Sequence, residues 1–143
     1  MLDRAGYDEI NGPVIDEFRA RGGKAAGPEG VFEGKPLVLV HHTGAKSGTE
    51  RIAPLMPLVD DGRIYVFATK GGSDTDPDWY RNVIANPGVT VELGNEKFAA
   101  STRVLEGAER DEIYAKQAAA LPVFAEVQAK TRRVIPVVEL VRN

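Results

Sequence analysis

The chain has 143 residues, of which 43% are hydrophobic and 27% are charged, a composition typical of one soluble globular domain. It contains no cysteine, which excludes disulfides, iron–sulfur clusters and cysteine-based zinc sites. Its net charge of −3 argues against a nucleic-acid binder, because affinity for a phosphate backbone requires a basic surface.

Neither a membrane span nor an export signal is visible in the sequence. The longest apolar run, residues 36–40, is far shorter than the about 20 residues that a membrane-spanning helix needs. The N-terminal residues do not form the apolar stretch of a signal peptide. We therefore expect one domain over residues 1–143, located in the cytoplasm.

Apolar patterns and turn residues predict the elements of the first half of the chain, which are a helix over residues 11–23 and strands over residues 37–43, 51–59 and 63–69. Pro54 and Pro57 cannot donate hydrogen bonds to a neighbouring strand, which predicts an edge, a bulge or a position beside a ligand. The turn at residues 60–62 predicts a hairpin between the last two strands. In that hairpin, Arg51 lies roughly opposite Thr69.

In the second half, we expect a helix with Asp76 as its cap and Pro77 at its first position, ending before Asn86-Pro87. The elements predicted after it are strands over residues 89–93 and 97–105, a helix over residues 108–121, a short helix starting at Pro122, and a strand over residues 135–141. Because most of these strands are joined by hairpins, the order favours an antiparallel sheet or barrel with peripheral helices.

The turn between the first two strands carries the clearest chemical signal. It contains Lys46, Ser47, Gly48 and Arg51, and such a set of cations, hydroxyl and glycine amides can bind a phosphate or carboxylate. Ala45 stands where a Walker A loop has glycine, so the turn is not a nucleotide-binding loop of that type. An ordinary solvated turn remains the alternative.

A second glycine-containing loop, Thr69-Lys70-Gly71-Gly72, follows the strand over residues 63–69. Its lysine and its amides suit another anionic or planar part of a ligand. The predicted hairpin places this loop near the first one, which strengthens both interpretations. Basic residues near the C-terminus, Lys130, Arg132 and Arg133, are interpreted as a solvated helix end.

The two histidines, His41 and His42, are neighbours in a predicted strand and point to opposite faces, so they cannot form a two-histidine metal site. We expect one of them in the core and no metal. The chain also lacks the nucleophile elbow of a serine hydrolase. Trp79 and Tyr80 either form the wall of a planar ligand site or pack on the sheet.

Several motifs together resemble the deazaflavin-dependent nitroreductase family. They occur in the family's order and extend from the N-terminal helix to the closing strand, so that nearly the whole chain is covered. The motifs are Thr43-Gly44-Ala45-Lys46-Ser47-Gly48-Thr49-Glu50-Arg51 with Pro54-Leu55, Ala68-Thr69-Lys70-Gly71-Gly72, Asp76-Pro77-Asp78-Trp79-Tyr80-Arg81-Asn82, Ala85-Asn86-Pro87 and Arg133-Val134-Ile135-Pro136-Val137.

The resemblance implies an antiparallel split β-barrel of the flavin-reductase type, FMN-binding-like and mainly β, with peripheral helices. It also implies coenzyme F-420, an 8-hydroxy-5-deazaflavin whose phospholactyl-polyglutamate tail is anionic. The implied tail-binding residues are Lys46, Ser47, Gly48 and Arg51, and the implied ring-binding residues are Pro54, Leu55, Ala68, Thr69, Lys70, Gly71 and Gly72, supported by Trp79 and Asn82.

The implied reaction is hydride transfer from reduced F-420 to an electron-poor acceptor such as a quinone, an enone or a nitro compound, and it needs no catalytic nucleophile. Thr69, Tyr80 and Phe124 are the expected acceptor-side residues. Residues 122–130 contain no tyrosine, unlike the nitroimidazole-activating members, which argues against that substrate class.

Two alternatives to this activity remain open. One is an FMN-dependent reductase or oxidase on the same barrel, and the other is a carrier that binds reduced cofactor or a lipid without turnover. The resemblance is compatible with a monomer or a homodimer, and with peripheral membrane association through the N-terminal helix.

Overall fold

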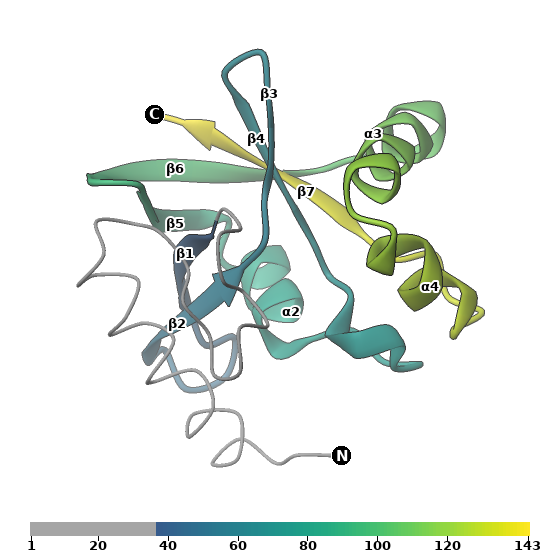
Figure 1. Cartoon of the computed structure of the whole chain (residues 1–143). Coiled ribbons are helices and arrows are strands. Elements are labelled where there is room, and N and C mark those ends of the chain that lie inside the picture. The colour runs from purple at the N-terminus through teal and green to yellow at the C-terminus, as the bar shows by residue number, and fades with distance from the viewer. Residues whose placement is uncertain (1–36) are drawn as a thin grey trace, which may run out of the picture.

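The computed structural model describes residues 37–143. Within this range, seven strands form one antiparallel sheet in the order β2-β1-β5-β6-β7-β4-β3, which curls in the manner of a half-barrel (Figure 1). The strands are β1 (Val38–Thr43), β2 (Glu50–Leu55), β3 (Leu58–Asp60), β4 (Arg63–Phe67), β5 (Gly88–Leu93), β6 (Glu96–Val104) and β7 (Val137–Arg142).

The helical elements of this range connect strands and cover the sheet. They are the short 3-10 turn η2 (Lys70–Gly72) and the α-helices α2 (Asp78–Ala85), α3 (Gly107–Ala120) and α4 (Val123–Ala129). None of the helices in residues 37–143 is long and apolar enough to cross a membrane. The helix predicted over residues 11–23 lies outside the described residues.

The prediction of a single strand over residues 51–59 is wrong. The chain leaves the sheet after Leu55 and enters it again at Leu58, so that β2 and β3 lie at opposite edges. Pro54 therefore lies in an edge strand, as predicted. β2 pairs with β1, and Arg51 is opposite His42 rather than Thr69. The hairpin predicted at residues 60–62 does form, but only between the short β3 and β4. It does not extend back to Arg51 and so does not bring the two glycine-containing loops together, because Pro57 removes a backbone donor where the ladder would continue.

The start of α2 also differs from the prediction. Pro77 has extended backbone angles (φ −66°, ψ 155°) and is the N-cap, while the helix begins at Asp78. The Asp76 carboxylate accepts a hydrogen bond from the Arg133 side chain instead of capping the helix. The local pattern predicted that this carboxylate would accept from the first backbone amides of the helix, but it accepts from an arginine 57 residues away.

Two apolar cores lie on the two faces of the sheet. The α2 core consists of inward-facing strand residues packed on Trp79 and Val83 of α2. The α3–α4 core includes Phe67, Tyr114 and Phe124. Successive residues of β4 alternate between the cores, with Ile64 and Val66 in the first and Tyr65 and Phe67 in the second, and Ala68, just after β4, belongs to the first. In Figure 1, α2 lies below the place where β4 and β7 cross in the view, and α3 and α4 lie to the right of it.

Candidate active site

The turn after β1 is tightly folded by its own backbone. The Gly44 N–H donates to the Thr49 carbonyl at 2.9 Å, and the Gly48 N–H donates to the Gly44 carbonyl at 3.0 Å. A Cβ on Gly44 would lie 2.5 Å from the Ser47 hydroxyl oxygen, and Gly48 has a φ of +69°. The left-handed backbone favours glycine at position 48, and a side chain at position 44 would displace the Ser47 hydroxyl.

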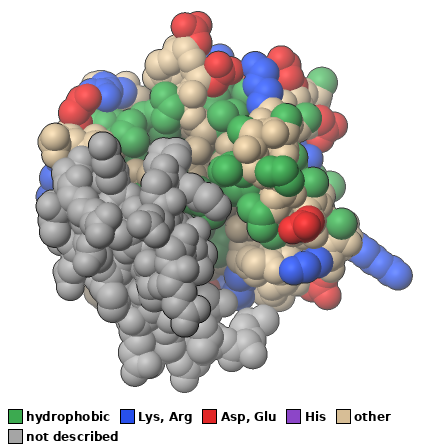
Figure 2. All heavy atoms as spheres, viewed as in Figure 1, with side chains coloured by type: hydrophobic (Ala, Val, Ile, Leu, Met, Phe, Trp, Pro, Cys, Tyr) green, Lys and Arg blue, Asp and Glu red, His purple; other side chains and the backbone are tan. Residues whose placement is uncertain are grey.

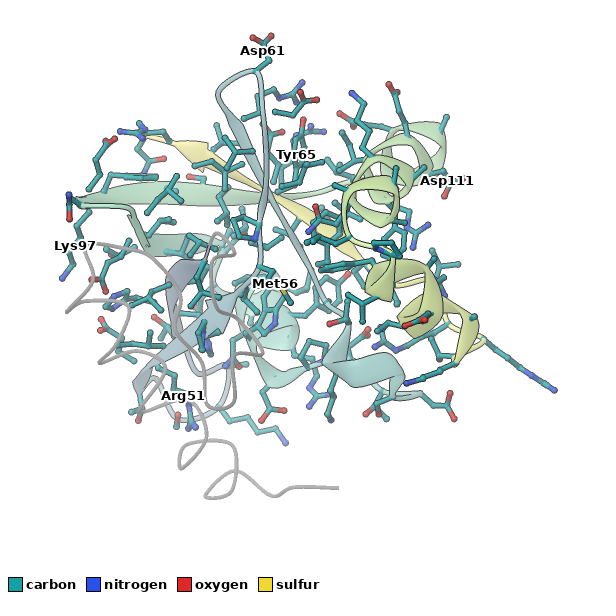
Figure 3. The ribbon with its side chains drawn as sticks, in the orientation of Figure 1. Arg51, Met56, Asp61, Tyr65, Lys97 and Asp111 are labelled. Carbon is teal, nitrogen blue, oxygen red and sulfur yellow. The ribbon has the colours of Figure 1, made fainter. Side chains whose placement is uncertain are left out.

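Two cations flank this turn without an internal partner. Across residues 37–143, neither the Lys46 ammonium nor the Arg51 guanidinium forms a hydrogen bond or ion pair with another side chain. Arg51 lies on the α2-facing side of β2, directly opposite His42, and Figure 3 shows it beside the turn. These charges are available to an anion from outside the chain.

The side chain of Asn82 connects the turn to α2. Its Oδ1 accepts from the Ala45 N–H at 2.9 Å, and its Nδ2 lies 3.0 Å from Nδ1 of His42. Because Oδ1 is the acceptor, Nδ2 is the donor and His42 Nδ1 must accept. Burial lowers the pKa of His42 to about 4, which keeps the ring neutral and able to accept.

His41 points to the opposite face of β1, as predicted from strand alternation. Its Nδ1 is 3.0 Å from a Glu50 carboxylate oxygen and its Nε2 is 2.5 Å from a Glu92 carboxylate oxygen. Both histidines are buried, whereas the sequence predicted only one in the core. Within the described part of the chain, no group of three or more histidine, aspartate or glutamate side chains is arranged to hold a metal ion.

The glycine-containing loop after β4 has an unusual backbone. Lys70, Gly71 and Gly72 have φ values of 44°, 64° and 84°, three successive residues in the left-handed region. A Cβ on Gly72 would lie 2.9 Å from the Lys130 Cβ and 3.0 Å from the Val127 carbonyl, so this loop packs closely on the end of α4. A non-glycine residue such as Lys70 in this region is strained, which is a common property of ligand-binding loops.

Arg133 holds this second loop in place. Its guanidinium donates to the carbonyls of Ala68 (3.0 Å), Thr69 (2.7 Å) and Ser73 (2.7 Å) and to the Asp76 carboxylate (3.1 Å). The interpretation of Arg133 as a solvated helix end is therefore wrong, because its side chain is mostly buried in contacts with residues about 60 positions away. Arg132, beside it, is exposed.

The predicted ring-binding and supporting residues are distributed over both loops and α2. Leu55, Ala68 and Trp79 pack in or against the α2 core, while Pro54 lies opposite Leu39 on the other face of β2. Trp79 contacts Tyr80 edge to face, with ring centroids 6.2 Å apart. Asn82 holds the first loop in place rather than offering a group to a ligand, since both polar atoms of its side chain are bonded to Ala45 and His42.

The three predicted acceptor-side residues do not converge. Thr69 lies after the end of β4, where its carbonyl accepts from Arg133, whereas Phe124 is buried within the α3–α4 core with its ring centroid 5.3 Å from that of Phe67. Tyr80 instead lines a cleft of about 440 Å³ formed with the start of α3 and the segment before β7, including Glu106, Arg110 and Val134. Burial raises the pKa of Tyr80.

The structural roles of two residues were not predicted from the sequence. Arg133 carried no local signal of a partner in a distant loop. Gln117 did carry one, because it falls on the apolar stripe of α3 with Ile113 and Tyr114, and a polar residue at such a position is informative.

A family model described as F420H(2)-dependent quinone reductase matches residues 15–142. This range includes both loops, α2 and the closing strand. The chain belongs to the F420H(2)-dependent quinone reductase family. The resemblance predicted from the motifs is thereby confirmed, since F420H(2) is the reduced form of coenzyme F-420, the deazaflavin that those motifs implied.

Individual relatives agree with this membership. The chain is 32% identical over 113 residues to an F420H(2)-dependent quinone reductase of Mycobacterium tuberculosis, covering 76% of this chain and 74% of the relative. A solved F420-H2 dependent reductase is 43% identical, with a TM-score of 0.68, covering 73% of this chain and 93% of the other. A structure described as a domain-swapped dimer is 37% identical, with a TM-score of 0.70 and coverage of 94% and 98%.

More distant structures show the fold alone. The haem storage protein of Vibrio cholerae is 13% identical, with a TM-score of 0.58 over 92% of this chain and 89% of that one. The split β-barrel with peripheral helices is therefore confirmed as the fold of this family member. The roles of individual residues toward cofactor and acceptor stay predictions.

Proposed function

We propose that this family member transfers a hydride from reduced F-420 to a small quinone. The family and its solved relatives supply the cofactor and the reaction class. The observation that carries the proposal for this chain is the pair of cations, Lys46 and Arg51, which flank a tightly folded turn without an internal partner among residues 37–143. Cations beside glycine amides and a hydroxyl supply the charge and the donors that bind a phosphate or carboxylate.

The residues present fit the cofactor. Its tail carries a phosphate and carboxylates, which match the Lys46 and Arg51 cations and the exposed hydroxyl of Ser47. Its ring is planar, and the left-handed loop at residues 70–72 allows close approach of a flat group to the backbone. When bound, reduced F-420 supplies a hydride, and the quinone takes that hydride and one proton to become the hydroquinone.

The chain itself contributes position rather than a reacting group. Asn82 fixes the first loop relative to α2, and Arg133 fixes the second loop relative to the segment before β7. Two rigid loops limit the orientations of a bound ring, and orientation is the main contribution a protein makes to a hydride transfer. The Thr69 hydroxyl is proposed to face the acceptor, and Phe124, whose ring is buried in the α3–α4 core, is proposed to support the acceptor side through its packing.

A quinone suits this acceptor side better than a nitroimidazole. The α4 segment contains the buried Phe124, the half-buried Val127 and no tyrosine, so it offers no phenol hydroxyl to a polar acceptor such as a nitroimidazole. A homodimer is compatible with the domain-swapped dimer found among the relatives. Cytoplasmic location and peripheral membrane association stay predictions.

The test is a fluorescence titration of F-420 into the protein, followed by addition of reduced F-420 and menadione in the same cuvette. Saturable quenching and acceptor-dependent return of the oxidised cofactor absorbance, above the rate without protein, are expected. Quenching without turnover across a panel of quinones and enones would favour the carrier alternative. Absence of quenching, with binding of FMN in a parallel titration, would favour the FMN alternative.

A further inference from the structure

His42, near the end of β1, has one ring nitrogen that the fold does not use. Its Nδ1 accepts from the Asn82 side chain at 3.0 Å, so the neutral ring carries its proton on Nε2. Burial keeps the ring neutral, because it lowers the pKa of His42 to about 4. Among residues 37–143, no hydrogen bond or ion pair joins Nε2 to another group. His42 therefore has a defined N–H donor whose acceptor is not found in the described part of the chain.

This donor is not sealed inside the core. The exposed fraction of His42 is only 4%. Within residues 37–143, however, the one fully buried side-chain nitrogen or oxygen atom that lacks a partner is Nε2 of Gln117. Nε2 of His42 also lacks a partner, so it retains contact with the surface. A donor that is largely desolvated but still accessible forms a strong hydrogen bond when a ligand reaches it.

The neighbours of His42 are polar groups of the first loop. Arg51 is its direct partner on β2, and side chains at such positions have Cβ atoms about 4.5–5.5 Å apart. Gly44 lies two residues after His42, and because its N–H still pairs with the Thr49 carbonyl, it faces the same side. A Cβ on Gly44 would lie 2.5 Å from the Ser47 hydroxyl oxygen and 3.7 Å from Nε of Arg51. The imidazole, the hydroxyl and the guanidinium therefore share one side of the turn.

The charges on this side of the turn favour an anion. Lys46 and Arg51 form no ion pair within residues 37–143, whereas cationic and acidic side chains lie interspersed over the face shown in Figure 2. Asp78, the acidic group that acts on the His42 ring, is already paired with Arg81. The Nε2–H adds a directional donor to the two cations without adding charge. Cations and N–H donors on one side of a turn are the groups that bind phosphate oxygens.

We propose that the Nε2–H of His42 donates a hydrogen bond to a phosphate oxygen of the F-420 tail, an inference that rests on the proposed function. Lys46 and Arg51 supply the charge, and His42 fixes the phosphate through one directional bond. Asn82 is the positioning residue, because its amide holds the tautomer that has the proton on Nε2. His42 is therefore a binding residue that distinguishes the phosphorylated cofactor from the same deazaflavin without its tail.

Two substitutions separate the roles of the two ring nitrogens. His42→Asn places an amide oxygen near the position of Nδ1, where it can accept from Asn82, and removes the Nε2 donor. We expect this variant to keep the wild-type Tm and to raise the Kd for F-420 about 10-fold, the effect of losing one hydrogen bond to a charged group. Its Kd for 8-hydroxy-5-deazaflavin without the phospholactyl-polyglutamate tail should equal that of wild type, because this ligand has no phosphate.

His42→Gln is the matched control. It places an amide nitrogen near the position of Nε2 and removes the acceptor for Asn82. We therefore expect a lower Tm than in His42→Asn, together with a smaller increase in the Kd for F-420. Fluorescence titration and thermal unfolding of the two variants and the wild type measure these effects.

A spectroscopic readout on wild type does not depend on the folding of a variant. In protein labelled with 15N-histidine, F-420 should move the Nε2–H proton resonance of His42 downfield, since the N–H then donates to a phosphate oxygen. The deazaflavin without its tail should leave this resonance in place.

Equal Kd values of wild type and His42→Asn for F-420 would overturn the inference and leave the proposed function intact. An equal loss of affinity for F-420 and for the tail-less deazaflavin would also overturn it, because that pattern indicates a role in the shape of the turn. So would an unshifted Nε2–H resonance in wild type saturated with F-420. Failure of wild type to bind F-420 at all would overturn the proposed function and the inference with it.

Discussion

The side-chain oxygen of Asn82 accepts a hydrogen bond from the backbone N–H of Ala45, 37 residues earlier in the chain, at 2.9 Å. This bond joins α2 to the turn that carries Lys46 and Arg51. The same amide donates to His42, so one side chain sets the position of the turn relative to both β1 and α2. The proposed anion site therefore depends on Asn82, although both polar atoms of this side chain are bonded within the protein and are not available to a ligand.

Asn82→Ala should weaken F-420 binding without removing any charge. Loss of the two buried hydrogen bonds should lower the free energy of unfolding by about 1–3 kcal/mol and raise the Kd for F-420 about fivefold or more, because the turn loses its anchor. Urea unfolding and fluorescence titration measure the two effects. Asn95→Ala, in the exposed β5–β6 turn, is the control that should change neither. An unchanged Kd in Asn82→Ala would show that the turn holds its shape alone.

Stability should fall with acid between pH 6.5 and pH 4 because of His42. Burial lowers its pKa from 6.5 to about 4, so in this range the unfolded chain binds a proton that the folded protein does not. The free energy of unfolding should therefore rise by up to about 3 kcal/mol from pH 4 to 6.5 and then level off. His42→Gln should remove this slope. Observation of a His42 NMR titration near pH 6.5 in the folded protein would contradict the argument.

Lys46→Ala and Arg51→Ala should each weaken F-420 binding by about 1.5–3 kcal/mol if each cation contacts the anionic tail. The loss should shrink as salt is added, since screening already weakens the wild-type contact. Titrations at low and high salt measure both effects. Lys97→Ala removes an exposed cation from the β5–β6 hairpin and should leave the Kd unchanged (Figure 3). Unchanged titrations for Lys46→Ala and Arg51→Ala would exclude this turn from the cofactor site.

Arg133→Met should loosen the loop after β4. The substitution leaves the carbonyls of Ala68, Thr69 and Ser73 without their charged donor, and we expect a loss of about 2–3 kcal/mol in the free energy of unfolding, together with weaker F-420 binding. Arg133→Lys should not restore either, because an ammonium cannot reproduce the planar set of donors. Arg132→Met, with the same change in charge on an exposed neighbour, is the control. Similar melting temperatures for Arg132→Met and Arg133→Met would contradict this prediction.

A second acid-sensitive element lies away from the proposed site. Hydrogen bonds from Arg63, and also from Arg103, lower the pKa of the buried Glu139 carboxyl from 4.5 to about 2, against the effect of burial. Its stabilising contribution is complete above pH 4.5 and is lost as the pH falls toward 2. Glu139→Gln should lower the free energy of unfolding at pH 7 by about 3 kcal/mol and flatten the acid limb below pH 4.5. Glu96→Gln, in an exposed pair with Arg142, should cost less than about 1 kcal/mol. If Glu139→Gln and Glu96→Gln lowered the free energy of unfolding equally, the argument that burial strengthens the Glu139 contacts would be contradicted.

Local sequence signals predicted most of the elements. The turn at residues 60–62 contains Asp61 and Gly62 with φ values of 52° and 77°, and the β5–β6 turn contains Gly94 at 59°, conformations that these residue types favour. The helix predicted over residues 108–121 is α3, shifted by one residue. The prediction of one strand over residues 51–59 failed because pairing partners are a property of the whole sheet, and the run is interrupted at Pro57.

The sequence by itself determined the family, the class of fold and the two glycine-containing loops, because motif spacing, turn residues and alternation are local properties. Only the tertiary structure decided which side chains are free and which are occupied. Within residues 37–143, Lys46 and Arg51 have no hydrogen-bond or ion-pair partner, Asn82 and Arg133 are used to hold loops, and the buried amide nitrogen of Gln117 is unpaired. These outcomes depend on strand order and on contacts between segments tens of residues apart, and no periodicity within one segment carries that information.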